Sequence, residues 1–516
     1  MTELLLTTLN ARYTHASLGL RCLRANLGAL KPRSIIREFT ISQRPIDIVE
    51  ALLAESPKII AIGVYIWNAR ESLEVVRLLS QLAPEVKVVL GGPEVSFELA
   101  GSEWLTLADH VITGEGEVAF ARLAEALLDG VEVPTQIIPG GLPDVKTMAL
   151  PYGEYSDEDL AHRVVYFEAS RGCPFSCEFC LSSLDEKVRN FPLEAVLSAL
   201  ARLIERGAKQ FKFIDRTFNL SPKVSHALLD FFLERQAEGL FVHFEVVPDR
   251  FPEALRTRIA RFSPGSLQLE VGIQTFDAET AKRIARPQDN EVIEANLRWL
   301  SSTGAHVHAD LIIGLPGEDA ASFGRGFDRL VATGPAEVQV GILKRLKGTP
   351  IIRHDVEYAV VWSHEPPYEI LSNRLIPFAQ MQRLKRFARV WDLISNRGHF
   401  THSLPLLWSR SGSPFESVLH FSNWINTRAS LGGIALARLA ELFLEYLVLQ
   451  GQERETAGLQ IAKDFSRPGQ HVPVVLQPWV KTVSAELKKS LPSRQARHVR
   501  AGSPPPAREG NDRSQS

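Results

Sequence analysis

Three of the four cysteines in this 516-residue chain stand close together, as Cys173, Cys177 and Cys180. They lie in a segment marked by glycine and proline that follows a strand-like run at 164–169. Clustered thiolates in a chain otherwise poor in cysteine indicate a shared metal centre. Zinc takes four ligands, and no histidine nearby completes such a site. A cubane iron–sulfur cluster also takes four thiolates, so three would leave one iron open to a substrate. A zinc knuckle or three buried thiols are the alternatives.

The spacing Cys-x3-Cys-x2-Cys, with Phe179 just before the last cysteine, resembles the signature of the radical S-adenosylmethionine (SAM) enzymes. The resemblance implies that Cys173, Cys177 and Cys180 ligate a 4Fe-4S cluster whose open iron binds the amino and carboxylate groups of SAM. It also implies that Phe179 borders the adenine and that the reduced cluster cleaves SAM to methionine and a 5′-deoxyadenosyl radical. An electron donor such as flavodoxin or ferredoxin would then be a partner.

Strand and helix signals alternate along residues 1–135. Strands are predicted at 4–9, 59–65, 86–90 and 110–113, and helices at 17–30 and 69–82. This alternation predicts a doubly wound, Rossmann-like parallel sheet with helices on both faces. Ligands of such sheets bind beyond the carboxyl ends of the strands. The distinctive residues of this region follow those ends, at 10–15, 65–68, 91–96 and 114–117.

This arrangement resembles the cobalamin-binding domain that precedes many radical SAM domains. The resemblance rests on the segments 10–19 and 64–66 and on the pair Gly91-Gly92, which would let the backbone approach the nucleotide tail. The cobalamin-binding residues that it implies are Asn10, His15, Gly91, Gly92, Gly114 and Glu115. The Asp-x-His-x-x-Gly motif that supplies a histidine to cobalt is missing, and His15 is favoured as a pocket residue over a cobalt ligand. The alternative is a sheet that binds another ligand or none.

A linker rich in proline, glycine and acidic residues is predicted at 136–162, ahead of a core at 163–350. Strands are predicted in this core at 164–169, 211–215, 242–247, 267–274, 307–313 and 338–342. The motifs FIDRTFN (213–219), LEVGIQT (269–275), DLIIGLPGE (310–318) and KRLKGTP (344–350) resemble the radical SAM branch that includes methylthiotransferases and many cobalamin-dependent enzymes. The predicted fold of the core is a partial (β/α)6 barrel.

One face of these strands is repeatedly polar, as the two-residue period of a strand makes visible. It carries Glu270 and Gln274 on the fourth strand, and His308 and Asp310 on the fifth. Both faces of a strand covered by helices should be buried, and buried polar groups need partners. A water-filled lumen that holds SAM and substrate explains these polar side chains, and internal salt bridges are the alternative explanation. The candidate acceptors for the amino and ribose groups of SAM are Asp215, Glu270, Gln274 and Asp310. His243 and His308 are candidates to orient the substrate or relay a proton.

After the core the strand–helix rhythm stops, and residues 351–491 read as mostly helical. This part resembles the uncharacterised C-terminal domain attached to one group of cobalamin-binding radical SAM proteins, which also share the segment 10–21 and FIDRTFN. The last residues, 492–516, are polar and rich in proline, a composition typical of disorder.

The net charge of −2 and near-neutral pI give no signal for nucleic acid or membrane binding. A lone Cys22 and the cysteine cluster favour a reducing cytoplasm. The expected activity is that of a cobalamin-dependent radical SAM enzyme, for methyl transfer or rearrangement of an unknown substrate. A methylthiotransferase is disfavoured because no further cysteine cluster is present to hold a sulfur donor. A non-catalytic iron–sulfur or cobalamin redox sensor is the alternative from another class.

Overall fold

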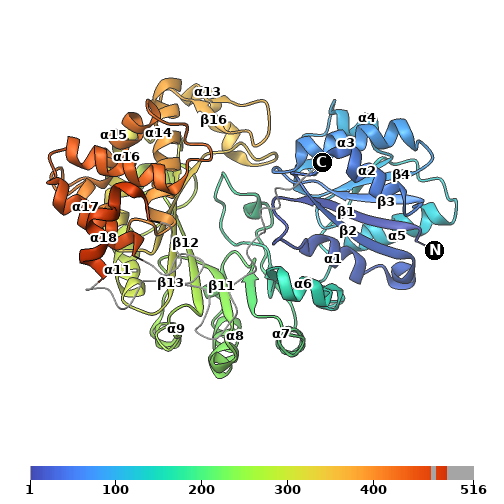
Figure 1. Ribbon diagram of the computed structural model, residues 1–516. Coiled ribbons are helices and arrows are strands. Elements are labelled where there is room, and N and C mark those ends of the chain that lie inside the picture. Colours follow the sequence, from blue (N-terminus) through green and yellow to red (C-terminus); the bar gives the residue numbers. More distant parts are fainter. Residues whose placement is uncertain (1, 467–471, 485–516) are drawn as a thin grey trace.

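The computed structural model describes residues 2–466 and 472–484 (Figure 1). The tail predicted to be disordered, 492–516, lies outside the described residues. A first domain (blue) and a set of C-terminal helices (orange and red) flank a central sheet drawn in green and yellow. None of the helices in these ranges combines the length and the apolar character that a membrane crossing requires.

The first domain is built on a six-stranded parallel sheet in the order β2-β1-β3-β4-β5-β6. Its strands are β1 (Leu4–Asn10), β2 (Ser34–Thr40), β3 (Ile59–Gly63), β4 (Lys87–Gly91), β5 (His110–Thr113) and β6 (Ile137–Pro139). Its helices are α1 (Leu18–Ala25), α2 (Pro45–Leu53), α3 (Ala69–Leu82), α4 (Glu103–Leu107) and α5 (Glu117–Leu128). The strand order reverses between β1 and β3, which is where doubly wound sheets bind ligands.

Alternating side chains of β1 pack on opposite faces of this sheet. Leu5 belongs to the apolar cluster that buries α2 and α3, and Leu4 and Leu6 belong to the cluster that buries α1 and α5. The strand is completely buried because helices cover both of its faces. The predicted Rossmann-like architecture is confirmed.

Two parts of the first domain differ from the prediction. The stretch 34–53, for which no element was predicted, forms β2 and α2. The helix predicted at 17–30 ends at Ala25, because Asn26 caps it and Gly28 turns the chain with a φ of 55°. The predicted linker also carries structure: β6 joins the first sheet, and α6 (Asp157–His162) begins with a capping box between Ser156 and Asp159.

The core is a second parallel sheet in the order β14-β13-β12-β11-β10-β7. Its strands are β7 (Val165–Phe167), β10 (Gln210–Phe213), β11 (Phe241–Val246), β12 (Leu267–Gln274), β13 (His306–Ile313) and β14 (Glu337–Ile342). The helices that follow them are α7 (Leu193–Glu205), α8 (Pro222–Glu234), α9 (Glu253–Ile259), α10 (Ala278–Arg283), α11 (Asn290–Ser301) and α12 (Ala320–Ala332). Since β7 and β14 are edge strands and do not pair, the predicted partial (β/α)6 barrel is confirmed.

The C-terminal part is mostly helical, as predicted. A hairpin of β15 (Val361–Trp362) and β16 (Ile370–Ser372) follows α13 (Asp355–Tyr358). The helices beyond it are α14 (Phe378–Trp391), α15 (Pro414–Asn426), α16 (Leu436–Leu449), α17 (Arg454–Phe465) and α18 (Gln477–Ser484). An aromatic contact fixes this part to the barrel: Phe327 of α12 lies 5.0 Å from Phe387 and 4.8 Å from Trp391, measured between ring centroids.

Candidate functional site

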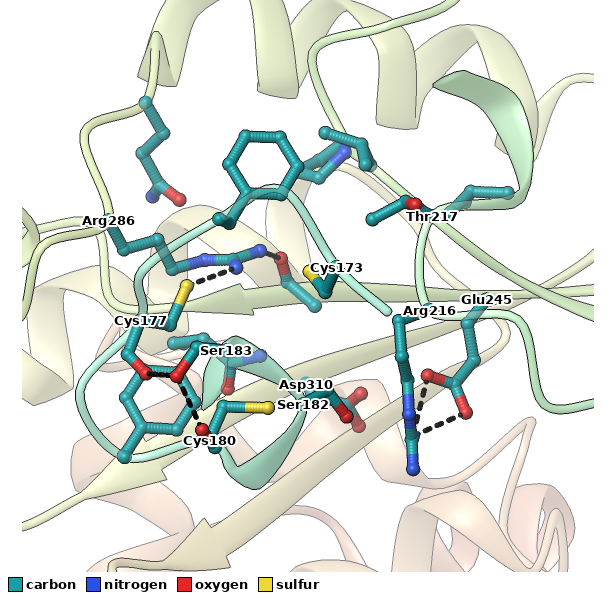
Figure 2. Close-up of a pocket in the computed structure, with 18 of the residues that line it drawn as sticks. Cys173, Cys177, Cys180, Ser182, Ser183, Arg216, Thr217, Glu245, Arg286 and Asp310 are labelled. Carbon is teal, nitrogen blue, oxygen red and sulfur yellow. Dashed lines mark hydrogen bonds and ion pairs between the residues drawn. The ribbon is translucent and has the colours of Figure 1, made fainter. Parts of the chain in front are cut away.

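The three clustered cysteines line one cavity of about 260 Å³ at the carboxyl ends of the barrel strands. Cys173 and Cys177 are buried, and Cys180 is partly exposed. Figure 2 shows the three cysteines around this pocket, with the sulfur atom of Cys177 next to Arg286 and that of Cys180 directed toward Asp310. The three cysteines that the sequence spacing grouped therefore do share one site.

Hydrogen bonds within the cysteine segment hold it in place. The amide of Cys173 donates to the carbonyl of Asp185 at 2.8 Å, and the hydroxyl of Ser183 donates to the carbonyls of Cys177 and Cys180. The short strands β8 (Ser170–Arg171) and β9 (Arg189–Asn190) pair at the base of the segment. Hydrogen bonds from one backbone amide and from the hydroxyl of Ser183 thus hold the loop that carries the thiols.

A single metal ion does not suit this arrangement. Within residues 2–466 and 472–484, no three His, Cys, Asp or Glu side chains are grouped as one ion would require. A zinc site needs its ligands to converge on one point. A cubane cluster has several separate irons, each bound by its own thiolate. The cysteines that line the cavity therefore fit a cluster better than zinc.

Arg286 is a neighbour of the thiols that the sequence analysis missed. Its Nη1 lies 3.3 Å from the Sγ of Cys177, and its Nη2 donates to the carbonyl of Gly272 at 2.5 Å (Figure 2). The arginine follows α10, and no local pattern in the sequence links it to a cysteine 109 residues earlier. The side chain brings a permanent positive charge to the cysteine segment.

Of the four predicted SAM-binding acceptors, Glu270, Gln274 and Asp310 line the same cavity as the cysteines. Phe179 lines it too. Deeper in the lumen, the polar side chains pair with one another. Glu270 lies 2.9 Å from the Nε2 of His243, and His308 lies between Asp310 at 3.1 Å and Glu337 at 3.4 Å. The polar strand face thus serves both an open cavity and an internal ion-pair network.

Asp215 does not line this cavity. Its carboxylate accepts hydrogen bonds from the amide of Ala169 and the hydroxyl of Ser170, which ties the end of β10 to the start of the cysteine segment. Burial raises the pKa of Asp215 to about 7, even though the hydrogen bond from Ser170 lowers it. These contacts give the aspartate a positioning role.

A second cavity, of about 540 Å³, lies at the carboxyl ends of the first sheet. Four of the predicted cobalamin-binding residues line it: Gly91, Gly92, Gly114 and Glu115. Its other walls include apolar side chains of α1 and of the sheet, and Leu181 and Leu184 from the cysteine segment. The largely apolar lining and the position near the strand-order reversal fit a large, partly apolar ligand.

A buried ionic network closes the barrel side of this second cavity. The guanidinium of Arg171 lies 2.8 Å from both Glu115 and Glu117 and 2.7 Å from Glu168. Burial raises the pKa of Glu168, although Arg171 opposes the shift. The arginine thus joins the first domain to the end of β7. No local pattern in the sequence links Arg171 to Glu115, which lies 56 residues earlier in the chain.

Of the residues predicted to bind cobalamin, Asn10 and His15 do not line the second cavity, and Gly92 also has a structural role. Asn10 does not line the second cavity; its Nδ2 donates to Glu38 at 3.0 Å. His15 lies outside it as well, with its Nδ1 2.5 Å from the hydroxyl of Tyr166. Gly92 has a φ of 106°, and an added Cβ would lie 2.4 Å from the carbonyl oxygen of Val64. Close packing of the backbone therefore already requires this glycine.

Comparison with protein families agrees with this division of the chain. Residues 5–124 match the B12 binding domain, and residues 167–329 match the radical SAM superfamily. The chain is a radical SAM protein with an N-terminal B12-binding domain. Residues 356–471 match a family of proteins of unknown function, DUF4080, which agrees with the predicted uncharacterised C-terminal domain.

Curated relatives match over slightly more than half of the chain. An uncharacterized methyltransferase of Pyrococcus horikoshii is 28% identical over 302 residues, which is 53% of this chain and 63% of that protein. The 2-(S-pantetheinyl)-carbapenam-3-carboxylate methyltransferase of Streptantibioticus cattleyicolor is 27% identical over 347 residues, 57% of this chain and 48% of that protein. The matches thus span from about half to under two thirds of these relatives.

Solved structures show the same fold over more of the chain. The cobalamin-dependent radical enzyme OxsB, with aqua-cobalamin bound, superposes with a TM-score of 0.61 at 13% identity, over 94% of this chain and 81% of that one. The methyltransferase TsrM of Kitasatospora setae, with cobalamin and a 4Fe-4S cluster bound, gives 0.56 at 18% identity, over 71% of this chain and 82% of that one. At these identities the likeness concerns the fold alone.

Proposed function

We propose that the protein is a cobalamin-dependent radical SAM enzyme that transfers a methyl group to its substrate or rearranges it. One observation carries the proposal: a single turn of chain separates the two cavities. Ser182 and Ser183 line the cysteine cavity, and Leu181, Leu184 and Asp185 line the second cavity. Ligands in the two cavities would therefore lie on opposite sides of one short 3-10 helix, Leu181–Leu184.

When bound, the cluster and SAM would supply a 5′-deoxyadenosyl radical, and cobalamin would carry a methyl group. Cys173, Cys177 and Cys180 would ligate the cluster, and Phe179 would border the adenine. Glu270, Gln274 and Asp310 would accept hydrogen bonds from the amino and ribose groups of SAM, since each lines that cavity. Gly91, Gly92, Gly114 and Glu115 would line the cobalamin site.

The chain itself would exclude water and orient its ligands. Two of the three cysteines are buried, and the carboxylate of Asp215 holds the amide of Ala169 and the hydroxyl of Ser170 ahead of them. Arg171 holds the two domains together beside the second cavity. An enzyme of this kind would work in the cytoplasm with an electron donor such as flavodoxin or ferredoxin.

The test is a product analysis on protein purified without oxygen, with its cluster rebuilt and with SAM and a strong reductant added. We expect 5′-deoxyadenosine from the wild type and none from Cys177→Ala. S-adenosylhomocysteine that forms only when cobalamin is present would assign methyl transfer. An intact cluster whose spectrum does not respond to SAM would instead favour a redox sensor.

Cobalamin binding is tested separately. Protein reconstituted with hydroxocobalamin is expected to keep its colour through gel filtration. A bulky side chain at Gly91, whose added Cβ has no neighbour closer than 3.8 Å, should block the ligand without disturbing the fold. If Gly91→Leu retains cobalamin as well as the wild type, the second cavity is not its site.

A further inference from the structure

The segment that follows the last strand of the barrel contacts two loops, one beside each cavity. It begins in the motif KRLKGTP (344–350), shortly after β14, and ends with the 3-10 helix Pro350–His354. Its first half packs against the loop that follows β4 in the first domain, and its second half packs against the cysteine segment. We call residues 345–354 the connecting segment.

Glu94 anchors the first-domain end of the connecting segment. Its side chain is 4% exposed and stands shortly after the glycine pair at the end of β4. Its Oε1 lies 2.6 Å from the Nζ of Lys347 and accepts the hydroxyl of Tyr368 at 2.5 Å. A carboxylate buried this deeply depends on such partners, so the lysine keeps the loop against the barrel.

A second carboxylate of the same loop, Glu98, holds the middle of the connecting segment. It pairs with Arg345 at 2.7 Å and accepts the amide of Gly348 at 3.2 Å. An added Cβ on Gly348 would lie 2.4 Å from the ring of Phe97, so this ring packs directly on the glycine. Because Phe97 lines the second cavity, the connecting segment fixes part of the wall of that cavity.

The other end of the connecting segment holds Glu178, which stands between two of the clustered cysteines. Glu178 is 3% exposed, and its Oε2 lies 2.7 Å from the Nε2 of His354, which is also buried. Arg353 forms an ion pair with the same carboxylate. The carbonyl of Glu178 accepts the amide of Ile351 at 3.0 Å. Both the backbone and the side chain of Glu178 are therefore bound to the connecting segment.

Few residues separate the two anchored ends, and hydrogen bonds close the turn between them. The amide and the hydroxyl of Thr349 both donate to the carbonyl of Leu346, at 3.2 Å and 2.6 Å. Thr349 is 2% exposed, and the 3-10 helix starts at the next residue. The two ends therefore cannot move apart unless these hydrogen bonds break.

We propose that the connecting segment sets the separation of the cluster and cobalamin sites, with Glu178 and Glu98 as positioning residues. The 3-10 helix Leu181–Leu184 already lies between the two cavities, and the connecting segment adds a second tie between the loops beside them. A misplacement of about 1 Å between reacting groups can cost about a hundredfold in rate, so an enzyme that uses two cofactors gains from a fixed separation. The inference rests on the proposed function, because it places a cluster in one cavity and cobalamin in the other.

The experiment measures the magnetic coupling between the two cofactors in the reconstituted protein. Cob(II)alamin and the reduced cluster each carry an unpaired electron, and irradiation of the frozen sample reduces the cluster in place. Low-temperature electron paramagnetic resonance then reports the dipolar coupling, which falls with the cube of the separation. We expect one narrow coupling for the wild type, and a weaker and broader coupling for Glu178→Gln and Glu98→Gln.

Matched variants separate positioning from general damage. Glu103→Gln removes an ion pair with Arg77 that is similarly exposed and lies within the first domain, so it should leave the coupling unchanged. Glu98→Arg should weaken the coupling, and the addition of Arg345→Glu should restore it, because the ion pair returns with its charges exchanged. The side chains of Glu98 and Arg345 are 35% and 29% exposed, so these variants are expected to fold.

A second measurement needs neither cofactor. Hydrogen exchange followed by mass spectrometry is expected to be about twofold to fivefold faster at residues 173–184 in Glu98→Gln than in Glu103→Gln, which corresponds to the loss of one partly exposed ion pair. Protein that fails to retain the cluster or cobalamin contradicts the proposed function, and the exchange rates then decide on the connecting segment by themselves. Equal exchange in these two variants, or a coupling unchanged in both Glu178→Gln and Glu98→Gln, overturns the inference.

Discussion

The guanidinium of Arg286 lies 3.3 Å from the Sγ of Cys177 and is anchored on its other side by the carbonyl of Gly272. Hydrogen bonds and positive charge near a ligating sulfur stabilise the reduced, more negative state of an iron–sulfur cluster. Arg286 is therefore placed to raise the reduction potential of a cluster bound through Cys177. This would make the cluster easier to reduce by a physiological donor.

Removing this arginine should shift the potential. We expect Arg286→Leu to lower the midpoint potential of the reconstituted cluster by about 60 mV, the equivalent of one charge-assisted hydrogen bond for a one-electron couple. Arg286→Lys should keep part of the effect, because the charge is retained. Redox titration followed by electron paramagnetic resonance measures both. A potential equal to that of the wild type in Arg286→Leu would contradict the assignment.

The glycine before the first cysteine should be irreplaceable. Gly172 has a φ of 88°, and an added Cβ would lie 2.4 Å from the carbonyl oxygen of Lys187. Gly172→Ala is expected to cost about 1–3 kcal/mol of local strain and to reduce the iron bound after reconstitution. Gly153→Ala, which meets no atom within 4 Å, is the matched control. Equal iron content in the two variants would show that the segment tolerates a different backbone.

The contact between the first domain and the linker depends on Arg21. Its side chain is 3% exposed and binds Glu38 at 2.9 Å and Asp159 at 2.8 Å. Loss of one partner from a buried ionic group costs about 3–5 kcal/mol. Arg21→Met should therefore unfold more easily in urea and become sensitive to proteolysis around α6. In contrast, Arg37→Met removes a 53% exposed partner of Glu55 and should cost less than about 1 kcal/mol. Similar losses in both variants would contradict this account.

The parts of the site that are local in sequence could be predicted, and the parts that depend on packing could not. The cysteine spacing and the glycine pair were visible because the residues are neighbours, and β12 was predicted with its observed bounds, 267–274. The period of two along β12 and β13 also identified the lumen face. Arg286, Arg171 and Lys212 were missed, because each has a partner at least 56 residues away in the chain. A charged residue is usually solvated, and only the fold brings these three to a cavity or an ion-pair network.

His15 illustrates the same limit of local patterns. Its position after β1 suggested a residue that lines the cobalamin pocket, but the parallel bridge to Val164 turns it toward the barrel. Asp215 ends the strand predicted at 211–215 and was a candidate acceptor for the amino and ribose groups of SAM. The structure uses it for the amide of Ala169 and the hydroxyl of Ser170 instead of the cavity.

The last prediction concerns His308, which lies between two carboxylates in the lumen. Burial alone would lower its pKa, but hydrogen bonds to Asp310 and Glu337 outweigh burial and raise the pKa from 6.5 to about 10. Between these two pH values, His308 therefore keeps a proton in the folded protein that it releases in the unfolded chain. This stabilisation is complete below about pH 6.5 and is lost as the pH rises toward about 10.

His308→Gln should lower Tm by about 4 °C or more at low pH, and the difference should shrink as the pH increases. His420→Gln, at a histidine whose side chain is 66% exposed, should show no such trend. Scanning calorimetry across this range checks the prediction, and a constant gap between wild type and His308→Gln would mean that the histidine does not change its protonation there.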